Sequence, residues 1–461
     1  MKKRIYFFCL MVGILFMIPY TTLMPQDAHY WNLQYGTRST LLGGAVIGSV
    51  SDLSATYYNP GAVALFEDAN FILSARVYQL ETITVEDGAG KGKDLDYSTV
   101  VPSPSFVAFD LKFDFLGKAR LALSILTRQK MNFEFQTRLI DSLDILEGSP
   151  GKENFAGGIS IEREFDEVWG GITYSSKTSD MVGFGLTGYI AYRSQRASAQ
   201  TIVQVLPSEG DIASYTELQG FRYNNFRFLV KGGVGLDLNP LTLGLTVTSP
   251  SVNITGTGTV STHFFLSGVD TSGDGINDNQ FQSNFQDEVN SQYKSSWAVG
   301  VGGGYRLGKF KFHASAEWYD KVDKFFVLDT EEYTAQGSGE ILTNDLTHEY
   351  KSITNYGFGI DFFSNPDLIF SASFVTDFSA RVPDTETNHS VSTWNIYHIS
   401  GGTTFKVGRS DLTLGLEYAF GSKNIQRNID LTDPGNTKNP DIESDAKVIS
   451  SRFKILIGFV L

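Results

Sequence analysis

Cysteine is almost absent from this chain, since Cys9 is the only one among 461 residues. It lies in an apolar N-terminal stretch that we expect to be removed as a secretory leader, which would leave the mature chain without any. Disulfides, zinc–thiolate sites and cysteine nucleophiles are thereby excluded. Basic charge is also scarce, with 37 Lys and Arg against 51 Asp and Glu and a formal net charge of −14. Nucleic acid is therefore excluded as a partner, because its phosphates require a basic surface.

Long apolar runs are missing as well. The one apolar stretch at the N-terminus, residues 5–19, follows three basic residues and is too short for a convincing spanning helix. We predict a signal peptide over residues 1–27, cleaved between Thr21 and His29, with an uncleaved anchor as the alternative. Beyond it, no run approaches the roughly 18 apolar residues that a spanning helix needs. A secreted chain of this kind is either soluble, surface-attached or a barrel.

Apolar and polar residues alternate with a period of two along most of the chain. In residues 310–319, for example, Phe310 and Phe312 share one face while Lys311 and His313 share the other. Aromatic residues make up 13% of the chain and 46 residues are glycine. This composition suits a transmembrane barrel, because only every second strand residue faces lipid. Any half-buried antiparallel sheet alternates, however, so the connections between strands decide more.

We predict about fourteen strands whose connections alternate strictly between short and long. The strands are expected at residues 70–80, 104–115, 118–139, 165–176, 180–200, 219–238, 240–258, 293–306, 309–325, 347–363, 367–380, 394–407, 410–425 and 445–461. Short turns on one side of the membrane and long loops on the other are typical of outer-membrane barrels. The predicted fold class is all-β: a transmembrane antiparallel β-barrel of about fourteen strands, with twelve or sixteen as alternatives.

The residues between the predicted leader and the first strand are not strand-like. Gly43 and Gly44 permit tight turns, and Asn59-Pro60-Gly61 is a turn signal. In a wide barrel, an N-terminal segment of this kind can fold inward and fill the lumen. We therefore predict an N-terminal plug over residues 28–68 and a barrel over residues 69–461.

The glycine and asparagine–proline motifs of this stretch resemble a known family. The matching residues are Gly43-Gly44-Ala45, Asp52, Ser54-Ala55 and Tyr57-Tyr58-Asn59-Pro60-Gly61-Ala62. They resemble the FadL/TodX family of outer-membrane transporters for long-chain fatty acids and other hydrophobic compounds, whose pattern reads G-G-A, a short spacer, D-x-S-A and Y-N-P-A. One residue departs from that pattern, because Gly61 stands where the family usually has alanine.

The resemblance implies a fourteen-strand barrel with an N-terminal hatch. Ligand would be captured at the outer loops, pass to a hydrophobic site inside, and leave through a gap in the barrel wall after the hatch shifts. Asn59, Pro60 and Gly61 match the family's hatch motif and take that role by resemblance. Only the hatch role is carried over, and the family's ligand-contacting residues are not assigned to positions of this sequence.

Basic residues on the predicted inward faces could bind a ligand carboxylate. The candidates are Arg227, Lys231, Arg306 and Lys311. A fatty carboxylate in an apolar lumen would need such a partner, since an unpaired buried charge is costly. The alternative is that these side chains form ion pairs with inward acids, for which the sequence offers Asp237, Glu317, Asp361, Asp377 and Glu417.

One acidic stretch of the sequence offers a candidate metal site. Asp270, Ser272, Asp274 and Asp278 have the spacing of a calcium loop, but Phe281 stands where the last ligand would be. A plain acidic external loop is the alternative, and no other cofactor is indicated. The six histidines are scattered, with only His313 and His398 expected to point inward, and no catalytic motif is present. We do not expect an enzyme.

The leading functional hypothesis is passive uptake of long-chain fatty acids or other hydrophobic small molecules across the outer membrane. The alternative is a FadL-like subunit that handles secreted proteins in a type IX secretion system, for which the long acidic loops would suit partner binding. Outer-membrane lipid would surround the barrel in either case. A structural or adhesive barrel is a third reading, for which the sequence gives no positive sign.

Overall fold

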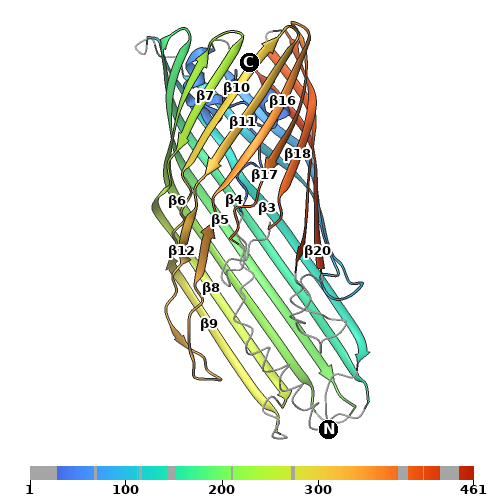
Figure 1. The fold of residues 1–461 in the computed structure, drawn as a ribbon. Coiled ribbons are helices and arrows are strands. Elements are labelled where there is room, and N and C mark those ends of the chain that lie inside the picture. The colour runs from blue at the N-terminus through green and yellow to red at the C-terminus, as the bar shows by residue number, and fades with distance from the viewer. Residues whose placement is uncertain are drawn as a thin grey trace.

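A computed structural model describes residues 28–66, 70–111, 113, 117–143, 151–208, 211–270, 276–382, 393–408, 410–425 and 446–461. Within these residues the strands form a closed antiparallel barrel of fourteen, sealed by pairing of the first strand with the last (Figure 1). The predicted fold class and strand count are therefore confirmed. The predicted signal peptide lies outside the described residues.

The barrel wall follows chain order, and two of its strands are interrupted. Its elements are β1 (Phe71–Glu86), β2 (Leu95–Leu111), β3 (Ala119–Leu143), β4 (Glu153–Ser179), β5 (Val182–Leu206), β6 (Ala213–Asp237), β7 (Leu241–Thr248) continued as β8 (Val252–Val269), β9 (Asp278–Asn290) continued as β10 (Ala298–Leu307), β11 (Phe310–Tyr319), β16 (Ile353–Asn365), β17 (Leu368–Asp377), β18 (Ile396–Val407), β19 (Ser410–Ile425) and β20 (Ala446–Val460). Two small separate sheets pair β12 (Val322–Leu328) with β15 (Leu346–Tyr350) and β13 (Tyr333–Thr334) with β14 (Ile341–Leu342).

Connection lengths and exposed side chains define the two ends and the outer face of the barrel. The predicted short turns between β4 and β5, β6 and β7, β10 and β11, and β16 and β17 are all present. Large apolar side chains are exposed around the outside, among them Ile172, Val301, Phe358 and Leu416. Such a band is unfavourable in water and matches a hydrocarbon layer, so the protein is an outer-membrane barrel with its short turns on the inner side.

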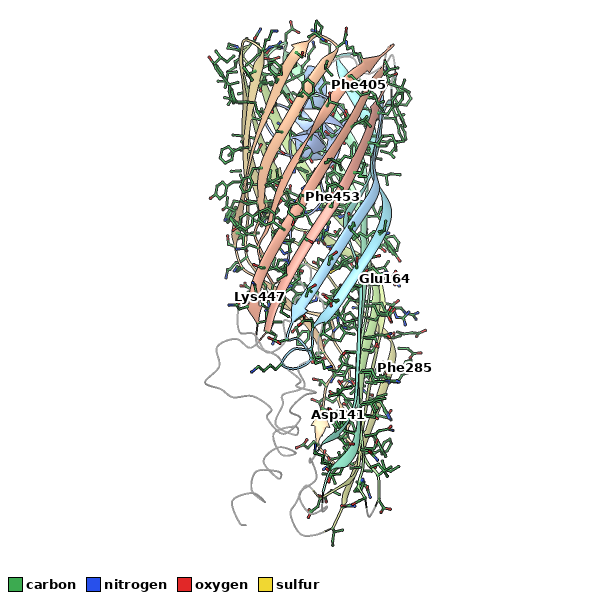
Figure 2. The ribbon with its side chains drawn as sticks, turned by 90° about the vertical axis from the view of Figure 1, so that its right-hand side faces the viewer. Asp141, Glu164, Phe285, Phe405, Lys447 and Phe453 are labelled. Atoms are coloured by element: carbon green, nitrogen blue, oxygen red, sulfur yellow. The ribbon has the colours of Figure 1, made fainter. Side chains whose placement is uncertain are left out.

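Several strands run much further than the alternation predicted. β4 begins at Glu153 rather than at residue 165, and β2 begins at Leu95 rather than at residue 104. The extra part of β4 is paired on both sides, with β3 and β5, while its outward Glu164 is exposed. A charged outer face is stable there because β3 to β6, β8 and β9 project beyond the rest of the wall (Figures 1 and 2). Alternation assigns these polar stretches to loops only if lipid covers the whole length of each strand, which is not the case for the projecting part.

Residues 28–66, which we call the inner segment, lie inside the short-turn end of the barrel (Figure 1). They contain three short helices, α2 (Arg38–Leu41), α3 (Ala55–Tyr58) and η1 (Pro60–Leu65), and almost all of their side chains are buried. The inner segment touches strands on every side, since η1 packs on β4, β5 and β6 and α2 packs on β17, β18 and β19. Among the described residues, none of the helices is long and apolar enough to cross a membrane.

Candidate functional site

The Asn-Pro-Gly motif fastens the inner segment to the wall. Asn59 is fully buried and precedes η1, whose first turn it caps by accepting a hydrogen bond from the Gly61 amide at 3.1 Å. Its side-chain amide donates to the Ile47 carbonyl at 2.9 Å and to the Val234 carbonyl of β6 at 3.0 Å. Pro60 occupies the first position of η1, where its missing N–H is not needed. One asparagine therefore joins two parts of the inner segment to the barrel.

Gly61 packs directly on the backbone of two wall strands. A Cβ added at Gly61 would lie 2.5 Å from the Gly233 carbonyl oxygen of β6 and 2.8 Å from the Gly183 carbonyl oxygen of β5. The wall positions are also glycine, so backbone meets backbone without side chains between them. The family's usual alanine would not fit this contact, and the departure noted in the sequence has a local steric reason.

We expect Gly61→Ala to loosen the inner segment, because backbone on both sides leaves no room for a methyl group. A misfit of this kind costs about 1–3 kcal/mol. We expect it to weaken docking of the inner segment and to leave the stability of the barrel unchanged. Hydrogen exchange of residues 55–66 in detergent should rise in the variant. Gly170→Ala is the matched control, since a Cβ there meets nothing within 4 Å. Unchanged exchange in Gly61→Ala would show that the contact is not tight.

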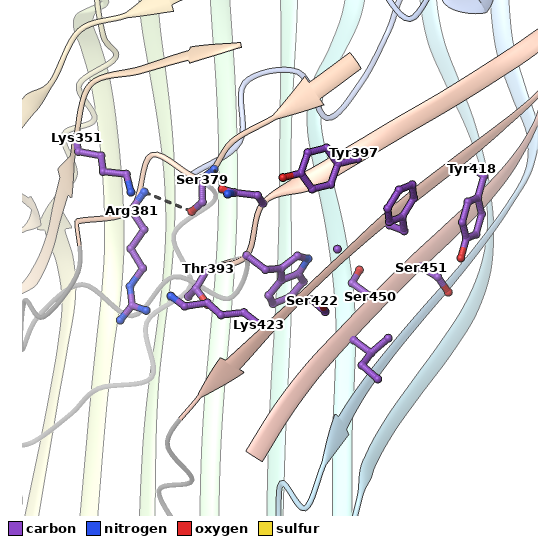
Figure 3. A pocket seen from close by; sticks show the side chains of 15 residues that line it. Lys351, Ser379, Arg381, Thr393, Tyr397, Tyr418, Ser422, Lys423, Ser450 and Ser451 are labelled. Atoms are coloured by element: carbon purple, nitrogen blue, oxygen red, sulfur yellow. Dashed lines mark hydrogen bonds between the residues drawn. The ribbon is translucent and has the colours of Figure 1, made fainter. Parts of the chain in front are cut away.

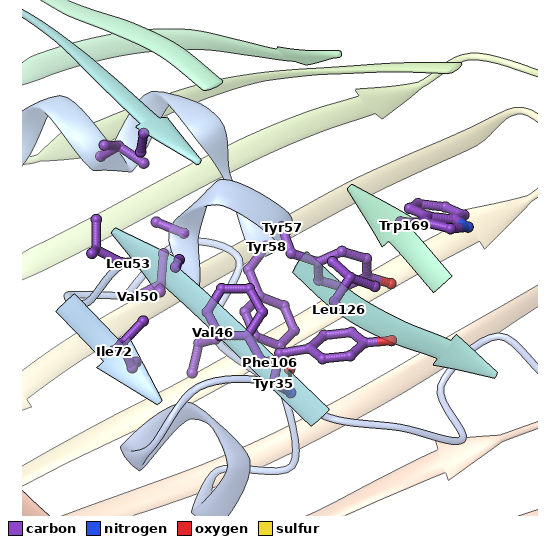
Figure 4. Packing of buried hydrophobic residues seen from close by; sticks show 14 of the residues in the cluster. Tyr35, Val46, Val50, Leu53, Tyr57, Tyr58, Ile72, Phe106, Leu126 and Trp169 are labelled. Carbon is purple, nitrogen blue, oxygen red and sulfur yellow. Dashed lines mark hydrogen bonds between the residues drawn. The ribbon is translucent and has the colours of Figure 1, made fainter. Parts of the chain in front are cut away.

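The inner segment contacts the two sides of the barrel through different chemistry. Against β1 to β6 the contact includes an apolar and aromatic cluster, in which Tyr35, Tyr57 and Tyr58 pack with Phe106 and Trp169 (Figure 4). Hydrogen bonds accompany this cluster, such as those that the Thr187 and Tyr189 hydroxyls of β5 donate to the Thr56 carbonyl. Polar contacts prevail on the opposite side, from β10 to β20. They include the Trp31 indole donating to Glu317, the Tyr30 and Trp31 amides donating to Asp377, the Ile47 amide donating to Ser315, and Ser49 bonded to His313.

Asp52, in the family-like motif, serves the internal structure of the inner segment. Its carboxylate accepts a hydrogen bond from the Ser54 amide at 2.9 Å and another from the Ser54 hydroxyl. Burial raises the pKa of the Asp52 carboxyl, and the Ser54 bonds and nearby Arg38 oppose that shift. Asp52 thus fixes the turn that precedes α3.

The wall has a gap between β2 and β3. Their ladder ends at the pair Phe106–Leu126, whereas β2 stays paired with β1 out to Leu95 and β3 stays paired with β4 out to Leu143. Beyond Phe106, therefore, no described residue pairs β2 with β3 in the sheet. Farther out the gap is bridged by Tyr97, whose hydroxyl donates to the Asn132 carbonyl and whose ring centroid lies 6.3 Å from that of Phe133.

Two prolines in β2 accompany this gap. The register of β1 against β2 shifts beside Ala75, the partner of Pro104, and again before Gln79, across from Pro102. Proline has no N–H to donate to a ladder, and the bulges that result bend a strand. The first shift leaves an extra residue on β2 and the second leaves one on β1, so both strands are irregular beside the point where the β2–β3 ladder ends.

A central cavity lies between the inner segment and the wall. Its volume is about 60 Å³. Its aromatic lining consists of Tyr30, Tyr57, Trp169, Tyr293, Tyr319 and Tyr350, and its charged lining of Arg128, Glu167, Arg227, Lys231, Lys294 and Glu317. Four of these charged groups are basic and two are acidic, so the lining favours an anion.

Arg128 is a buried basic residue of this cavity that forms no ion pair within the described residues, although the carboxylates of Glu167 and Glu317 lie near enough to interact with it electrostatically. Its side chain is 5% exposed and forms no hydrogen bond or ion pair within the described part of the chain. The guanidinium instead lies 5.5 Å from the Trp169 ring centroid and 6.0 Å from that of Tyr57. Cation–π contact of this kind holds a charge without neutralising it.

A bulge in β3 is what aims Arg128 inward. The register of β3 against β4 shifts between Thr127 and Gln129, so Arg128 is an extra residue and both it and Gln129 are buried. The Tyr35 hydroxyl of the inner segment donates to the Thr127 carbonyl at 3.0 Å, and the Gln129 side chain donates to the His29 carbonyl at 2.8 Å. The inner segment is therefore bonded to β3 on both sides of Arg128, at the edge of the wall gap.

The four predicted carboxylate partners lie in different places. Arg227 and Lys231 line the cavity, where Arg227 pairs with Glu167 at 2.8 Å and Lys231 pairs with Glu317 at 3.4 Å. Arg306 is exposed near the short-turn end, over the Phe363 ring, and Lys311 is partly buried. The cavity thus brings together two of the four, each already paired with an acid. His313 and His398 are buried, as expected, against Asp361 and Glu417 respectively.

The predicted calcium ligands are only partly described. Asp270 follows β8 and Asp278 opens β9, whereas Ser272 and Asp274 lie outside the described residues. No group of three or more metal-binding side chains occurs in the portion of the chain that the structure describes. The calcium loop stays a prediction.

Three solved structures that align with nearly the whole chain are a FadL homologue and two toluene transporters. A Pseudomonas aeruginosa FadL homologue aligns with a TM-score of 0.58 at 13% identity, covering 94% of this chain and 99% of its own. The Pseudomonas putida toluene transporter TodX gives 0.53 at 12%, covering 95% and 98%. The Ralstonia pickettii toluene transporter TbuX gives 0.52 at 11%, covering 93% and 99%. No family model and no curated protein matches the sequence. The resemblance read from the motif thus holds for the fold of nearly the whole chain.

Proposed function

We propose that this barrel, which shares its fold with the FadL and TodX transporters, is a passive outer-membrane channel for hydrophobic molecules with an acidic head, such as long-chain fatty acids. The observation that carries the proposal is Arg128, a buried guanidinium on the central cavity without a carboxylate partner among the described residues. A ligand carboxylate would supply that partner, and the aromatic lining would cover the first carbons of its chain.

Movement of the inner segment is part of this proposal. A pocket that holds an organic ligand has about 300–1,000 Å³, whereas the cavity has about 60 Å³. A long-chain ligand therefore enters only if the inner segment shifts. Its hydrogen bonds with either side can be exchanged for water at little cost, but its contact with β1 to β6 also includes the apolar cluster of buried tyrosines, whose exposure to water costs more. We infer that the inner segment separates from β10 to β20 and stays attached to β1 to β6.

The wall gap supplies a sideways exit for the ligand. Arg128 lies just past the Leu126 pair that ends the β2–β3 ladder, so the cavity and the gap share a boundary. The Tyr35 hydroxyl holds the backbone at that boundary. Because the inner segment stays bonded to β3 there, its separation from β10 to β20 would open the cavity beside this boundary, which couples movement of the inner segment to release into the membrane.

Binding of secreted proteins is a second candidate function, and one feature favours it. Beyond Leu126, β3 forms the edge of the projecting sheet and has no strand partner on the side of β2 among the described residues, although the Tyr97 hydroxyl donates to its Asn132 carbonyl. An uncovered strand edge can accept an extended segment of another chain. In this reading the projecting sheet would dock a secreted polypeptide, as a secretion-system subunit would, and the barrel would not mainly be a channel.

Uptake of labelled long-chain fatty acid into cells lacking their own transporter separates the two functions. The full chain should stimulate uptake, and deletion of residues 36–62 should change it. Assembly of each barrel is checked by its heat-dependent mobility on gels. Equal uptake with and without residues 36–62 would contradict a gating inner segment. No stimulation at all, together with stable co-purification of secreted protein from outer membranes, would favour the second candidate.

A further inference from the structure

A second cavity lies in the wall beside β18, β19 and β20. It forms where β19 continues beyond its last partner on β18. It has a volume of about 600 Å³ and lies against the outer ends of β18, β19 and β20 (Figure 3). β19 continues to Ile425 and stays paired with β20 to its end, but its last partner on β18 is Tyr397, opposite Phe420. The wall is therefore notched at the end that carries the long connections, which is the outer side of the membrane.

The lipid-facing side of this notch is aromatic. Tyr418 and Phe420 of β19 point outward, are 46% and 37% exposed, and stack with ring centroids 5.7 Å apart. Tyr397 of β18 extends the row, with its ring centroid 5.8 Å from that of Phe420. All three line the cavity. Aromatic rings at this level of a barrel lie where acyl chains meet headgroups.

Basic side chains line the same cavity on its outer side. Lys351 follows β15, Arg381 follows β17 and Lys423 lies near the end of β19. These three cations come from separate parts of the chain and line one cavity. Arg381 and Lys423 also interact with other groups of the chain. The combination of an aromatic floor in the membrane and cations at its rim suits an anionic amphiphile.

Trp394 gives the cavity a directed hydrogen-bond donor. The residue is 4% exposed, lines the cavity, and its indole N–H has no acceptor among the described residues. Gly421 of β19 is what lets the indole sit there, since an added Cβ would lie 2.5 Å from the Trp394 ring. A buried indole N–H normally has a partner, so an acceptor is expected at this site.

We propose that this cavity binds a phosphorylated lipid of the outer leaflet. Its phosphate would lie on Lys351, Arg381 and Lys423 and accept from the Trp394 indole, while its acyl chains would lie along Tyr397, Phe420 and Tyr418. The aromatic row faces the membrane, which favours a lipid over a soluble phosphate compound. This site lies apart from the central cavity, with which it shares no lining residue.

Binding of defined lipids to the purified full chain, measured by native mass spectrometry, tests the proposal. The probes are a bisphosphorylated glycolipid of the lipid A type, the same lipid after removal of its phosphates, and inorganic phosphate alone. We expect the phosphorylated lipid to bind roughly tenfold more tightly than the dephosphorylated one, a ratio that the triple variant Lys351→Gln, Arg381→Gln, Lys423→Gln should abolish. Trp394→Phe keeps the ring without the N–H and should weaken binding roughly tenfold.

Lys309→Gln combined with Lys406→Gln is the matched control, because both lysines are exposed at the short-turn end. It removes charge on the opposite side of the membrane and should leave binding unchanged. Equal binding of the two lipids, or an equal loss in the control, would overturn the proposal. So would full competition by inorganic phosphate at the lipid's own concentration. Heat-dependent gel mobility confirms that each variant is folded, so that weaker binding reports on the site.

Discussion

Replacing Arg128 by glutamine is expected to weaken binding of a long-chain fatty acid by about 10- to 100-fold and to leave binding of its methyl ester unchanged. The reason is that a charge-assisted hydrogen bond in a buried site contributes about 1.5–3 kcal/mol, and the ester cannot form it. Arg128 has no hydrogen-bond or ion-pair partner in the described residues, so its loss should not strand a buried carboxylate. Equilibrium binding of both ligands to the detergent-purified barrel measures the difference.

Arg306→Gln is the matched control for Arg128, because it removes the same group from an exposed position at the short-turn end. It should bind both ligands like the parent chain. Arg128→Lys should retain part of the affinity for the acid, since it keeps the charge. Equal weakening of acid and ester in Arg128→Gln would mean that the side chain shapes the cavity and does not bind the carboxylate.

Tethering the inner segment to the wall is expected to abolish uptake almost completely. Ala45 lies in the inner segment, and a Cβ added at Gly357 of β16 would lie 2.8 Å from its Cβ. Disulfides span Cβ atoms about 3.5–4.5 Å apart, so cysteines at both positions need a shift of about 1 Å. The tether would join the inner segment to β16, which belongs to the side of the wall, β10 to β20, from which we propose that the inner segment separates. Because the predicted mature chain has no cysteine, any disulfide would be the engineered one.

Fatty acid uptake should stop in the oxidised Ala45→Cys, Gly357→Cys barrel and return after reduction. Thr404→Cys with Thr413→Cys is the matched control, since these residues face each other on β18 and β19 with their hydroxyls 2.9 Å apart. That disulfide joins two wall strands and leaves the inner segment untethered, so oxidation should not affect uptake. Full transport by the oxidised Ala45→Cys, Gly357→Cys barrel would show that the inner segment does not need to leave β16.

The alternation of residues predicted the barrel correctly because the side chains of a strand in a membrane alternate with a period of two. The short turns and the long loops also lie at opposite ends of the strands. The final strand and the turn between β10 and β11 could be located from the sequence alone. Strand length was wrong wherever the wall leaves the membrane, as at Glu164, because a strand with water on its outer face need not be apolar there. The early part of β4 is a strand because it pairs with β3 on one side and β5 on the other. The sequence alone does not show that pairing.

The candidate site was predicted only in part, and Arg128 shows why. In a regular strand the side chains alternate, so every second residue before the buried Phe133 would point inward with it. Arg128 lies an odd number of residues away and would therefore point outward. The bulge at Arg128 reverses the alternation, and nothing in the local sequence marks it. Pro102 and Pro104 were a usable signal for the irregular wall nearby, since proline within a strand indicates an edge or a bulge. Ion pairing of Arg227 and Lys231 depends on Glu167 and Glu317, which lie far away in the chain.

The glycine contacts around Gly61 have a consequence for assembly in the cell. The inner segment meets wall backbone at Gly233 on one side and, through Gly48, at Gly302 on another. Contacts this close require the inner segment and the wall to fit together with little clearance. We therefore expect the segment to take its place before β20 pairs with β1 and closes the barrel. A defective Gly61 contact should then slow insertion of the barrel as well as impair uptake.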